Sequence, residues 1–331
     1  MLLLIDRMMI IGKGEFLFQV VEGWGKHFYS PFVEVAGVGT DQGDQVYVFI
    51  RGIDPLLVFN SQGDLLRCWG REHFTRPHGI LIAPDKTLYC VDDGKHTLQQ
   101  FTPEGRLLMT LGTKNKPSDT GCIDKDYRTI KQAAGPFNSP TDIAMDQQGN
   151  IYVSDGYGNS RVHKFSKEGE LLRSWGEPGR EPGQFNLPHG IAIDRGIVYV
   201  ADRENSRIQL FDLEGRFLEQ WSANRPTDVC IYDRNLYVTE LGYRTGSRLI
   251  STSPRDGVMH GRVSVLSLNG EVLSYLGGEE GCAPGSFFAP HTVAVDTKGD
   301  LYVGEVAITS VGSTGTVPAN CHTLQKLKRM C

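Results

Sequence analysis

Three histidines of the 331-residue chain occur in a repeated context. His78 lies in "RPHGILI", His189 in "LPHGIAI" and His291 in "APHTVAV". Each follows a proline and precedes an alternating run of residues that is typical of a β-strand. Three neutral imidazoles around one point are the ligand set of a catalytic zinc site with an open fourth position. The zinc hypothesis therefore depends on whether the fold brings these three segments together.

An internal repeat supplies the elements that would position the histidines. Similar segments begin at residues 32, 76, 139, 187, 225 and 289. The segment from Ser139 predicts four short strands, "DIAMD", "IYVSD", "RVHKFS" and "ELLRSWG", separated by turns rich in Gly, Asn and Asp. Four strands at a period of roughly 40 residues are typical of the blades of a β-propeller.

We therefore predict an all-β protein, a six-bladed β-propeller that forms a single domain over residues 1–331. The blades are expected at residues 32–70, 76–112, 139–176, 187–221, 225–277 and 289–330. The last unit lacks an outermost strand, and residues 15–22 have the pattern of one. We expect this N-terminal strand to complete the last blade and close the ring, since closure removes an exposed sheet edge.

In this ring the histidines fall in blades two, four and six, at the start of the innermost strand. Side chains there would converge on the axis and could hold Zn²⁺, although another divalent metal remains open. We place Asp142 and Asp228 in the same register in the intervening blades. They would either accept hydrogen bonds from the histidine rings or cap the backbone of their own "P-T-D" turns.

Three further residues are predicted to be catalytic. Arg51 and Arg203 each stand four residues after a tyrosine, at the end of the second strand in blades one and four, and Tyr157 follows the second strand of blade three. Arginine binds carboxylates in a bidentate fork, and a tyrosine can act as a general base. These residues predict a small-molecule or peptide substrate with a carboxylate. The alternative for the arginines is surface ion pairing, for example with Glu204.

The long insertions are expected on the same face as the histidines. They are the connections at residues 113–140, 241–261 and 305–321. In an antiparallel blade, the start of the first strand and the end of the second strand lie on one face. Binding loops concentrate on such a face, so the histidine side of the ring is the predicted functional mouth.

Composition excludes several classes of function. The net charge is −5 without a basic stripe, so no nucleic-acid partner is expected. Asp6 and Arg7 interrupt the apolar start "MLLLIDRMMII", which predicts neither a signal peptide nor a membrane span, and hence a cytoplasmic protein. The seven cysteines are widely spread without a C-x-x-C pair. That spacing argues against a disulfide framework and favours mostly reduced thiols.

Specific motifs resemble a known family. "SDGYGNSR", "ADRENSRIQ" and "VFIRG", together with the "P-H-G" strand starts, resemble the peptidyl-α-hydroxyglycine α-amidating lyases, which are six-bladed propellers of NHL repeats. The resemblance implies cleavage of the C–N bond of a carbinolamide to an amide and glyoxylate, with the metal polarising the hydroxyl group. It implies zinc ligands at His78, His189 and His291, a base at Tyr157, and active-site arginines at Arg51 and Arg203.

The sequence also departs from that family. Ala289 replaces a methionine two residues before the third histidine, Thr292 replaces an aspartate that helps hold a structural calcium ion, and Gly158 replaces a disulfide-forming cysteine. Calcium is therefore not expected. The alternatives are a lyase acting on a different small hydroxylated substrate, a metal-dependent hydrolase or lactonase, and a non-enzymatic binding scaffold.

Overall fold

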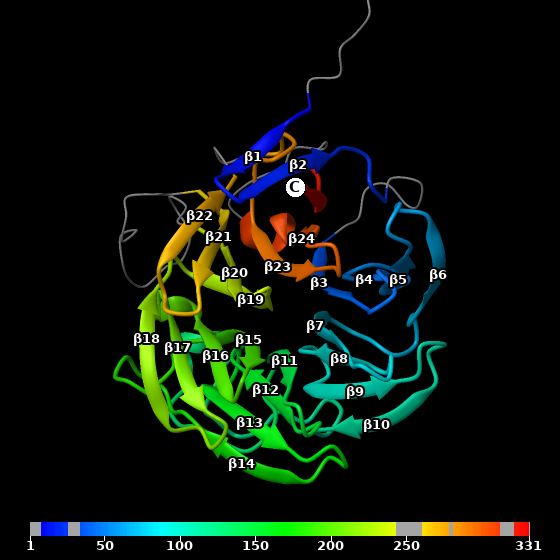
Figure 1. Cartoon of the computed structure of the whole chain (residues 1–331). Coiled ribbons are helices and arrows are strands. Elements are labelled where there is room, and N and C mark those ends of the chain that lie inside the picture. The colour runs from blue at the N-terminus through cyan, green and yellow to red at the C-terminus, as the bar shows by residue number, and fades with distance from the viewer. Residues whose placement is uncertain (1–7, 26–33, 243–259, 278–280, 312–320, 331) are drawn as a thin grey trace, which may run out of the picture.

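Six antiparallel sheets surround a central axis in the computed structural model, which describes residues 8–25, 34–242, 260–277, 281–311 and 321–330 (Figure 1). Each sheet is one blade, and in blades one to five the strands follow one another in chain order from the axis outward. The predicted six-bladed β-propeller is confirmed. The first two residues of the predicted first blade, 32 and 33, lie outside the described residues.

The strand bounds follow the predicted repeat. Blade one contains β3 (Val35–Thr40), β4 (Val46–Ile50), β5 (Leu56–Phe59) and β6 (Leu65–Trp69). Blade two contains β7 (Pro77–Ile82), β8 (Leu88–Asp92), β9 (Thr97–Phe101) and β10 (Leu107–Leu111). Blade three contains β11 (Pro140–Met145), β12 (Ile151–Asp155), β13 (Arg161–Phe165) and β14 (Leu171–Trp175).

The second half of the ring continues in the same way. Blade four contains β15 (Pro188–Asp194), β16 (Ile197–Asp202), β17 (Arg207–Asp212) and β18 (Phe217–Ser222). Blade five contains β19 (Pro226–Tyr232), β20 (Asn235–Glu240), β21 (Arg262–Ser267) and β22 (Val272–Leu276). Blade six contains β23 (Pro290–Val295), β24 (Leu301–Glu305) and β25 (Leu324–Arg329).

The N-terminal strand closes the ring, as predicted. β2 (Phe16–Val21) pairs antiparallel with β25, with Phe18 opposite Arg329, and so becomes the fourth strand of blade six. A further strand that the sequence analysis did not predict, β1 (Ile10–Lys13), pairs with β2 on its outer side. Both ends of the chain therefore contribute strands to the same sheet (Figure 1).

The core lies between blades rather than at the axis. The second residue of the second strand, or its equivalent, is a buried tyrosine in every blade: Tyr47, Tyr89, Tyr152, Tyr199, Tyr237 and Tyr302. Each packs with apolar side chains of the following blade in one of six separate clusters within the described residues. Burial of these large rings stabilises each blade pair and so holds the inner strands in a fixed geometry.

Helical structure is limited to three short elements in the described part of the chain. These are the 3₁₀ turns η1 (Tyr127–Thr129) and η2 (Arg203–Asn205) and the helix α1 (Ala307–Val311). None of the described helices has the length and hydropathy needed to cross a lipid bilayer. Most of the two long connections after β20 and β24 lies outside the described residues, so the prediction for their face stays untested there.

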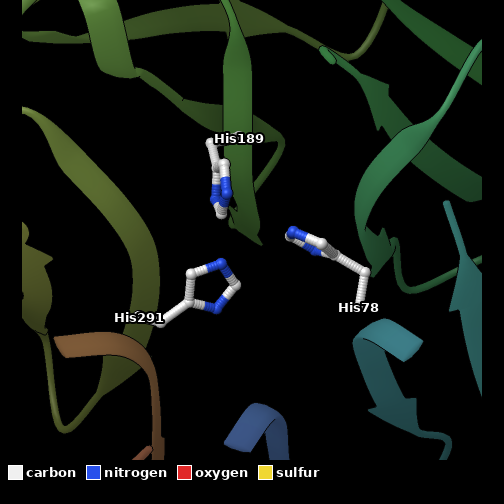
Figure 2. Close-up of side chains that lie close together, drawn as sticks. All are labelled: His78, His189 and His291. Atoms are coloured by element: carbon white, nitrogen blue, oxygen red, sulfur yellow. The ribbon is translucent and has the colours of Figure 1, made fainter. Parts of the chain in front are cut away.

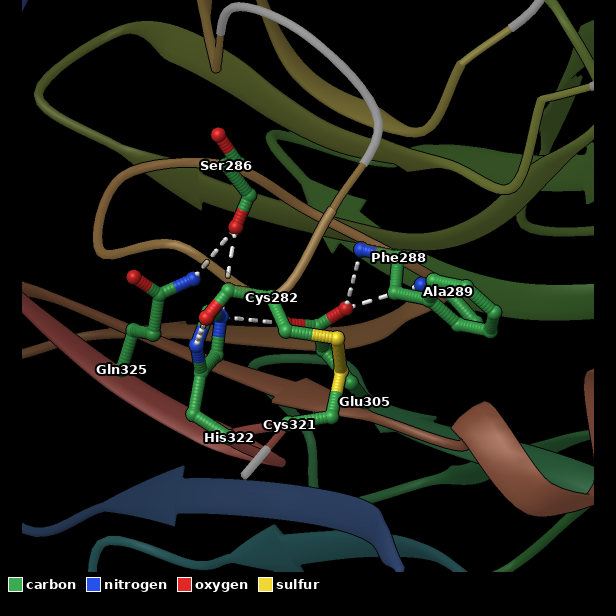
Figure 3. The surroundings of a disulfide bond; sticks show 8 residues. All are labelled: Cys282, Ser286, Phe288, Ala289, Glu305, Cys321, His322 and Gln325. Atoms are coloured by element: carbon green, nitrogen blue, oxygen red, sulfur yellow. Dashed lines mark hydrogen bonds and ion pairs between the residues drawn. A yellow bond between two sulfur atoms is a disulfide. The ribbon is translucent and has the colours of Figure 1, made fainter. Parts of the chain in front are cut away.

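One disulfide corrects the cysteine prediction. Cys282 and Cys321 are bonded, and they join the segment before β23 to the segment before β25 (Figure 3). Their 39-residue separation carries no motif, so spacing could not identify the pair. Cys68, Cys90, Cys122 and Cys230 are free thiols, in agreement with the prediction, and Cys331 lies outside the described residues.

Candidate active site

The three histidines meet on the axis of the ring. His78, His189 and His291 are the second residues of β7, β15 and β23, and their rings point toward one common centre (Figure 2). All three pairs of ring centroids are 4.8 Å apart. One nitrogen from each ring lies within 4.8 Å of the other two. The side chains are buried, so the fold brings together a compact set of three nitrogen ligands.

Backbone carbonyl groups of the next blade orient the rings. Nδ1 of His78 lies 2.5 Å from the Thr141 oxygen, Nδ1 of His189 lies 2.5 Å from the Thr227 oxygen, and Nδ1 of His291 lies 2.9 Å from the Ala36 oxygen. A carbonyl oxygen only accepts, so Nδ1 must carry the proton in each ring. The unprotonated Nε2 atoms are therefore the ones available to a metal on the axis.

The predicted register of Asp142 and Asp228 is wrong by one residue. In blades two and three alike, the proline that opens the innermost strand pairs with the acidic residue that ends the second strand. His78 consequently corresponds to Thr141, not to Asp142. The proline shared by "P-H-G" and "P-T-D" gives the same register, because it aligns Asp142 with Gly79. The carbonyl oxygens of the threonines, and not the aspartate carboxylates, accept from the rings.

The two aspartates instead cap the following blade. Asp142 Oδ2 accepts from the Ile191 N–H at 3.0 Å, and Asp228 Oδ2 accepts from the Val293 N–H at 2.9 Å. Burial raises the pKa of both carboxyl groups, and they interact directly with each other. A Cβ at Gly79 would lie 2.4 Å from Asp142 Oδ1, so the glycine after the histidine leaves room for this carboxylate.

Carboxylates at the end of the second strand hold the segment just before each histidine. In blades two, four and six these acceptors are Asp92 for the Arg76 N–H (3.0 Å), Asp202 for the Asn186 N–H (2.7 Å) and Glu305 for the Ala289 N–H (2.8 Å; Figure 3). Such bonds to charged acceptors are among the stronger ones in proteins. The sequence analysis missed this role, although an acidic residue ends five of the six second strands.

Tyr157 lies directly above two of the histidines. It follows β12, and its hydroxyl oxygen is 3.1 Å from His78 Nε2 and 3.2 Å from His189 Nε2. His291 Nε2 is buried and has no hydrogen-bond partner among the described residues. One hydroxyl proton can serve only one of three lone pairs. Unpartnered buried acceptors are costly, so this donor set fits a bound cation better than an apolar or water-free centre.

The environment also keeps the imidazoles neutral. Burial lowers the pKa of all three histidines well below the ordinary value, and nearby arginines lower it further. A metal ligand must be neutral imidazole. Because the rings are already neutral, a metal could bind here without first displacing protons from them.

Arg51 and Arg203 occupy equivalent positions directly after the second strand. The Arg51 N–H donates to the Glu34 carbonyl oxygen, and the Arg203 N–H donates to the Leu187 carbonyl oxygen. Arg51 forms an ion pair with Glu34 at 3.0 Å, and Arg203 pairs with Glu204 at 2.8 Å. The alternative of ion pairing is thus observed for both arginines. Their side chains are nevertheless only 11% and 12% exposed, and they line a partly open cavity above the histidines.

Two more arginines reach this cavity and were missed. Arg76 and Arg225 precede the proline that opens the innermost strand in blades two and five. The cavity measures about 190 Å³ and lies above the histidines, with Arg51, Tyr157 and Arg203 also in its wall. The signal was present in "RPHG" and "RPTD", in which the same residue recurs in two opposite blades.

The connection before blade three also reaches the mouth. Lys125 Nζ lies 3.3 Å from the carboxylate of Asp93, which also pairs with Arg76. The neighbouring Tyr127 lies close enough to Glu204 and Arg203 for their charges to affect its pKa, which burial raises. For residues 113–140, the prediction that the insertion lies on the histidine face agrees with the structure.

Comparisons with known proteins identify the family. The NHL repeat profile matches residues 137–165 and 185–211. NHL repeat-containing protein 3 of Homo sapiens is 30% identical over 318 residues, which cover 89% of this chain and 83% of that protein. This chain belongs to the NHL-repeat family. A gluconolactonase from Xanthomonas campestris has a similar structure, with a TM-score of 0.59 over 95% of this chain and 90% of that one, at 13% identity. That likeness concerns the fold alone.

Relatives of this NHL-repeat protein include amidating lyases. Peptidyl-alpha-hydroxyglycine alpha-amidating lyase 1 of Drosophila melanogaster is 27% identical over 281 residues, 78% of this chain. The aligned region spans 48% of the Drosophila protein. These relatives support an enzyme of the lyase type. Of the six residues predicted to be catalytic or metal-binding, four line the cavity of this NHL-repeat propeller: Arg51, Tyr157, Arg203 and His291. The other two, His78 and His189, lie against the Tyr157 hydroxyl.

Proposed function

We propose that this protein is a metal-dependent lyase that cleaves the C–N bond of a carbinolamide, such as an α-hydroxyglycine or a peptide ending in one, to an amide and glyoxylate. One observation carries the proposal. The Tyr157 hydroxyl is within hydrogen-bonding distance of Nε2 of His78 and His189, beside the unpartnered Nε2 of His291. A base candidate and a neutral three-nitrogen site thus share one point on the axis.

The three Nε2 atoms would hold the metal, with Zn²⁺ as the first choice and another divalent ion as the alternative. When bound, the ion supplies positive charge that polarises the substrate hydroxyl and makes its proton easier to remove. We do not expect a structural calcium ion. The Thr292 hydroxyl oxygen accepts from the Val38 N–H at 3.1 Å and cannot replace a carboxylate ligand in charge.

Tyr157 would act as the base. In this scheme the substrate hydroxyl proton passes to the tyrosine oxygen, the C–O group becomes the aldehyde of glyoxylate, and the C–N electron pair stays with nitrogen. The nitrogen then gains a proton and leaves as the amide. The guanidinium carbons of Arg76 and Arg203 lie 5.5 and 5.7 Å from the centre of the tyrosine ring. They place positive charge beside a ring that becomes negative when it gives up its own proton.

Arg51 and Arg203 would bind the substrate carboxylate from opposite blades. Arg51 Nη2 is buried without a hydrogen-bond partner among the described residues. The side-chain hydrogen bond recorded for Arg203 in the described region runs from Nε to Glu204, which leaves its two Nη groups for a ligand. Two guanidinium groups with spare donors match the geometry of a carboxylate.

Metal analysis and a glyoxylate assay on the same purified protein test this function. We expect close to one zinc ion per chain and glyoxylate release from α-hydroxyhippurate that stops on chelation and returns with zinc. Metal without glyoxylate release from any α-hydroxyglycine would refute the proposed reaction. Metal-dependent hydrolysis of a lactone in the same preparation would establish the hydrolase alternative instead.

We expect the working environment to be oxidising rather than cytoplasmic. The Cys282–Cys321 bond motivates this revision, because protein disulfides persist mainly in oxidising compartments. Neither nucleic acid nor membrane is expected as a partner. Location of the native protein by fractionation, with thiol labelling of these two cysteines, tests the revision. A reduced pair in a cytosolic fraction would restore the original prediction.

A further inference from the structure

The mouth contains more positive charge than the proposed reaction needs. Arg51 and Arg203 suffice to bind one carboxylate, yet Arg76 and Arg225 line the same cavity. No acidic side chain belongs to the described wall of this cavity. The two additional guanidinium groups therefore need an explanation of their own, and the following inference rests on the proposed function.

Carboxylates behind the wall neutralise only part of this charge. Glu34 pairs with Arg51. Asp93 pairs with both Arg76 and Lys125, and Glu204 pairs with both Arg203 and Arg225. Among the described residues, five cationic side chains thus share three carboxylates. Uncompensated charge in a partly buried site is unfavourable, so the mouth is suited to a ligand with more than one negative charge.

The two additional arginines differ in how much hydrogen-bonding capacity remains. Arg225 donates from Nε and Nη2 to Glu204 and from Nη1 to the Gly242 carbonyl oxygen. All three of its nitrogens are engaged, so it acts as a positioning residue that holds Glu204 against Arg203. Arg76 has a single recorded side-chain hydrogen bond in the described region, from Nη1 to Asp93. It is also the more exposed of the two, at 29% against 10%.

Arg76 also stands next to the reacting centre. Its guanidinium carbon is 5.5 Å from the Tyr157 ring, whose hydroxyl touches the histidine layer. It belongs to blade two, whereas the carboxylate-binding arginines belong to blades one and four. A substrate whose α-carboxylate is bound by Arg51 and Arg203 would extend its acyl group past Tyr157. A cavity of about 190 Å³ leaves room for only a small acyl group.

We propose that Arg76 recognises a second anionic group on the acyl side of the scissile bond. The preferred substrate is then a small N-acyl-α-hydroxyglycine whose acyl group carries its own carboxylate, and the released amide is the amide of a dicarboxylic acid. A guanidinium fork that binds a carboxylate distinguishes it from a neutral isostere because a charge-assisted pair is lost with the isostere.

Two matched substrates test the assignment. N-succinyl-α-hydroxyglycine carries the second carboxylate, and N-succinamoyl-α-hydroxyglycine replaces it with an amide of the same shape. We expect the wild-type protein to prefer the charged substrate by about tenfold or more in kcat/KM. In Arg76→Met the ratio should approach one. In the control Arg173→Met, on the exposed outer strand β14, the ratio should match that of the wild type.

Removal of Arg76 also leaves Asp93 buried with one partner fewer, so folding needs its own control. Arg76→Lys keeps a charge beside Asp93 but loses the planar fork, and its ratio should be intermediate. Equal kcat/KM values for the two substrates in the wild type, or an unchanged ratio in a folded Arg76→Met protein, would overturn the assignment.

A binding measurement separates this assignment from the proposed reaction. Succinamate, the dicarboxylate-derived product, and the neutral succinamide are titrated into the metal-loaded protein by calorimetry. Preferential binding of succinamate that Arg76→Met abolishes, without glyoxylate release from any substrate, would keep the anion site and refute the lyase. Glyoxylate release without this preference would keep the lyase and refute the anion site.

Discussion

The histidine layer and the arginine mouth are built in different ways, although they are neighbours. Each histidine stands at one register of the repeat, in alternate blades, and a main-chain carbonyl group of the next blade orients it. The arginines stand at two registers, in blades one and four and in blades two and five, and side-chain carboxylates hold them. The repeat thus determines the layer, whereas individual side-chain pairs determine the mouth.

This difference has a functional consequence. A layer fixed by the backbone tolerates change in its surroundings, because blades one, three and five each supply a main-chain carbonyl group whatever their side chains are. A mouth fixed by side-chain pairs can change its specificity through one substitution, such as the loss of Glu204 or Arg76. We therefore expect metal binding to depend on few residues and substrate preference to depend on many.

The largest effect is expected in the histidine layer. His189→Ala should remove stoichiometric zinc and reduce glyoxylate release by about 10³-fold or more, because two imidazoles rarely retain a catalytic metal. Metal analysis and kcat/KM measure the two effects. His73→Ala, outside the layer, is the control, since its ring packs on Phe101 at the blade edge. Full zinc content in His189→Ala would mean that zinc binding does not depend on the histidine layer, which contradicts the contrast between layer and mouth.

Tyr157→Phe tests the contact between the two regions. It removes the hydroxyl that touches His78 and His189 but keeps the ring that packs beside Arg76 and Arg203. We expect zinc to remain and kcat to fall by about 10²–10⁴-fold, the usual range for loss of a general base. Tyr275→Phe, on the outer strand β22, should behave like the wild type. An unchanged kcat would remove Tyr157 from the mechanism.

The same contrast explains which features the sequence could reveal. Recurrent strand, turn and proline patterns encode the blades, so six-fold architecture and ring closure were predictable. The histidines were predictable because an unusual residue recurs at one repeated position. Asp142 was misplaced although the proline shared by "P-H-G" and "P-T-D" aligns His78 with Thr141, and the pairing of Pro140 with Asp155 across β11 and β12 confirms that register.

The disulfide was missed because its two cysteines lie in connections that do not follow the repeat, and nothing in the strand pattern links them. Arg225 was missed although its position recurs in "RPHG" and "RPTD". Only its ion pair with Glu204 needs the three-dimensional arrangement. β1 was missed as well, because a fifth strand in blade six has no counterpart in the other five blades. Features that one blade alone contains require the three-dimensional arrangement.

Glu204→Gln should change the mouth and leave the layer intact. The carboxylate is shared by Arg203 and Arg225, so its loss leaves two buried guanidinium groups without an anionic partner. We expect KM for the α-hydroxyglycine to rise by about tenfold while zinc content stays the same. The matched control is Glu219→Gln, an exposed position on β18. A proportional loss of zinc would show that layer and mouth are not independent.

This substitution also has a predicted pH dependence. Burial alone would raise the pKa of Glu204, but Arg203 and Arg225 outweigh it, and the net pKa lies below the ordinary value of 4.5. A lowered pKa in the folded state contributes stability that is present above pH 4.5 and is lost as the pH falls through the lowered pKa. Urea unfolding should therefore show a difference between wild type and Glu204→Gln that shrinks below pH 4.5. A constant difference would contradict the ion-pair assignment.

The smallest effect on activity is expected from the disulfide, which links the segment before β23, the strand of the third histidine, to the segment before β25. Cys321→Ser opens a link across 39 residues and should lower the free energy of unfolding by about 2–4 kcal/mol, measured by urea titration. Glu305 would still accept from the Ala289 N–H, two residues before His291, so the start of β23 should keep its position. We therefore expect zinc content and kcat to stay within about twofold of the wild type.

Cys68→Ser, at an exposed free thiol, is the control for loss of a cysteine alone. Loss of zinc in a folded Cys321→Ser protein would mean that the disulfide, a side-chain link, helps to hold His291 in place. The third histidine would then be positioned by side chains, as the arginines are, and not by the backbone alone.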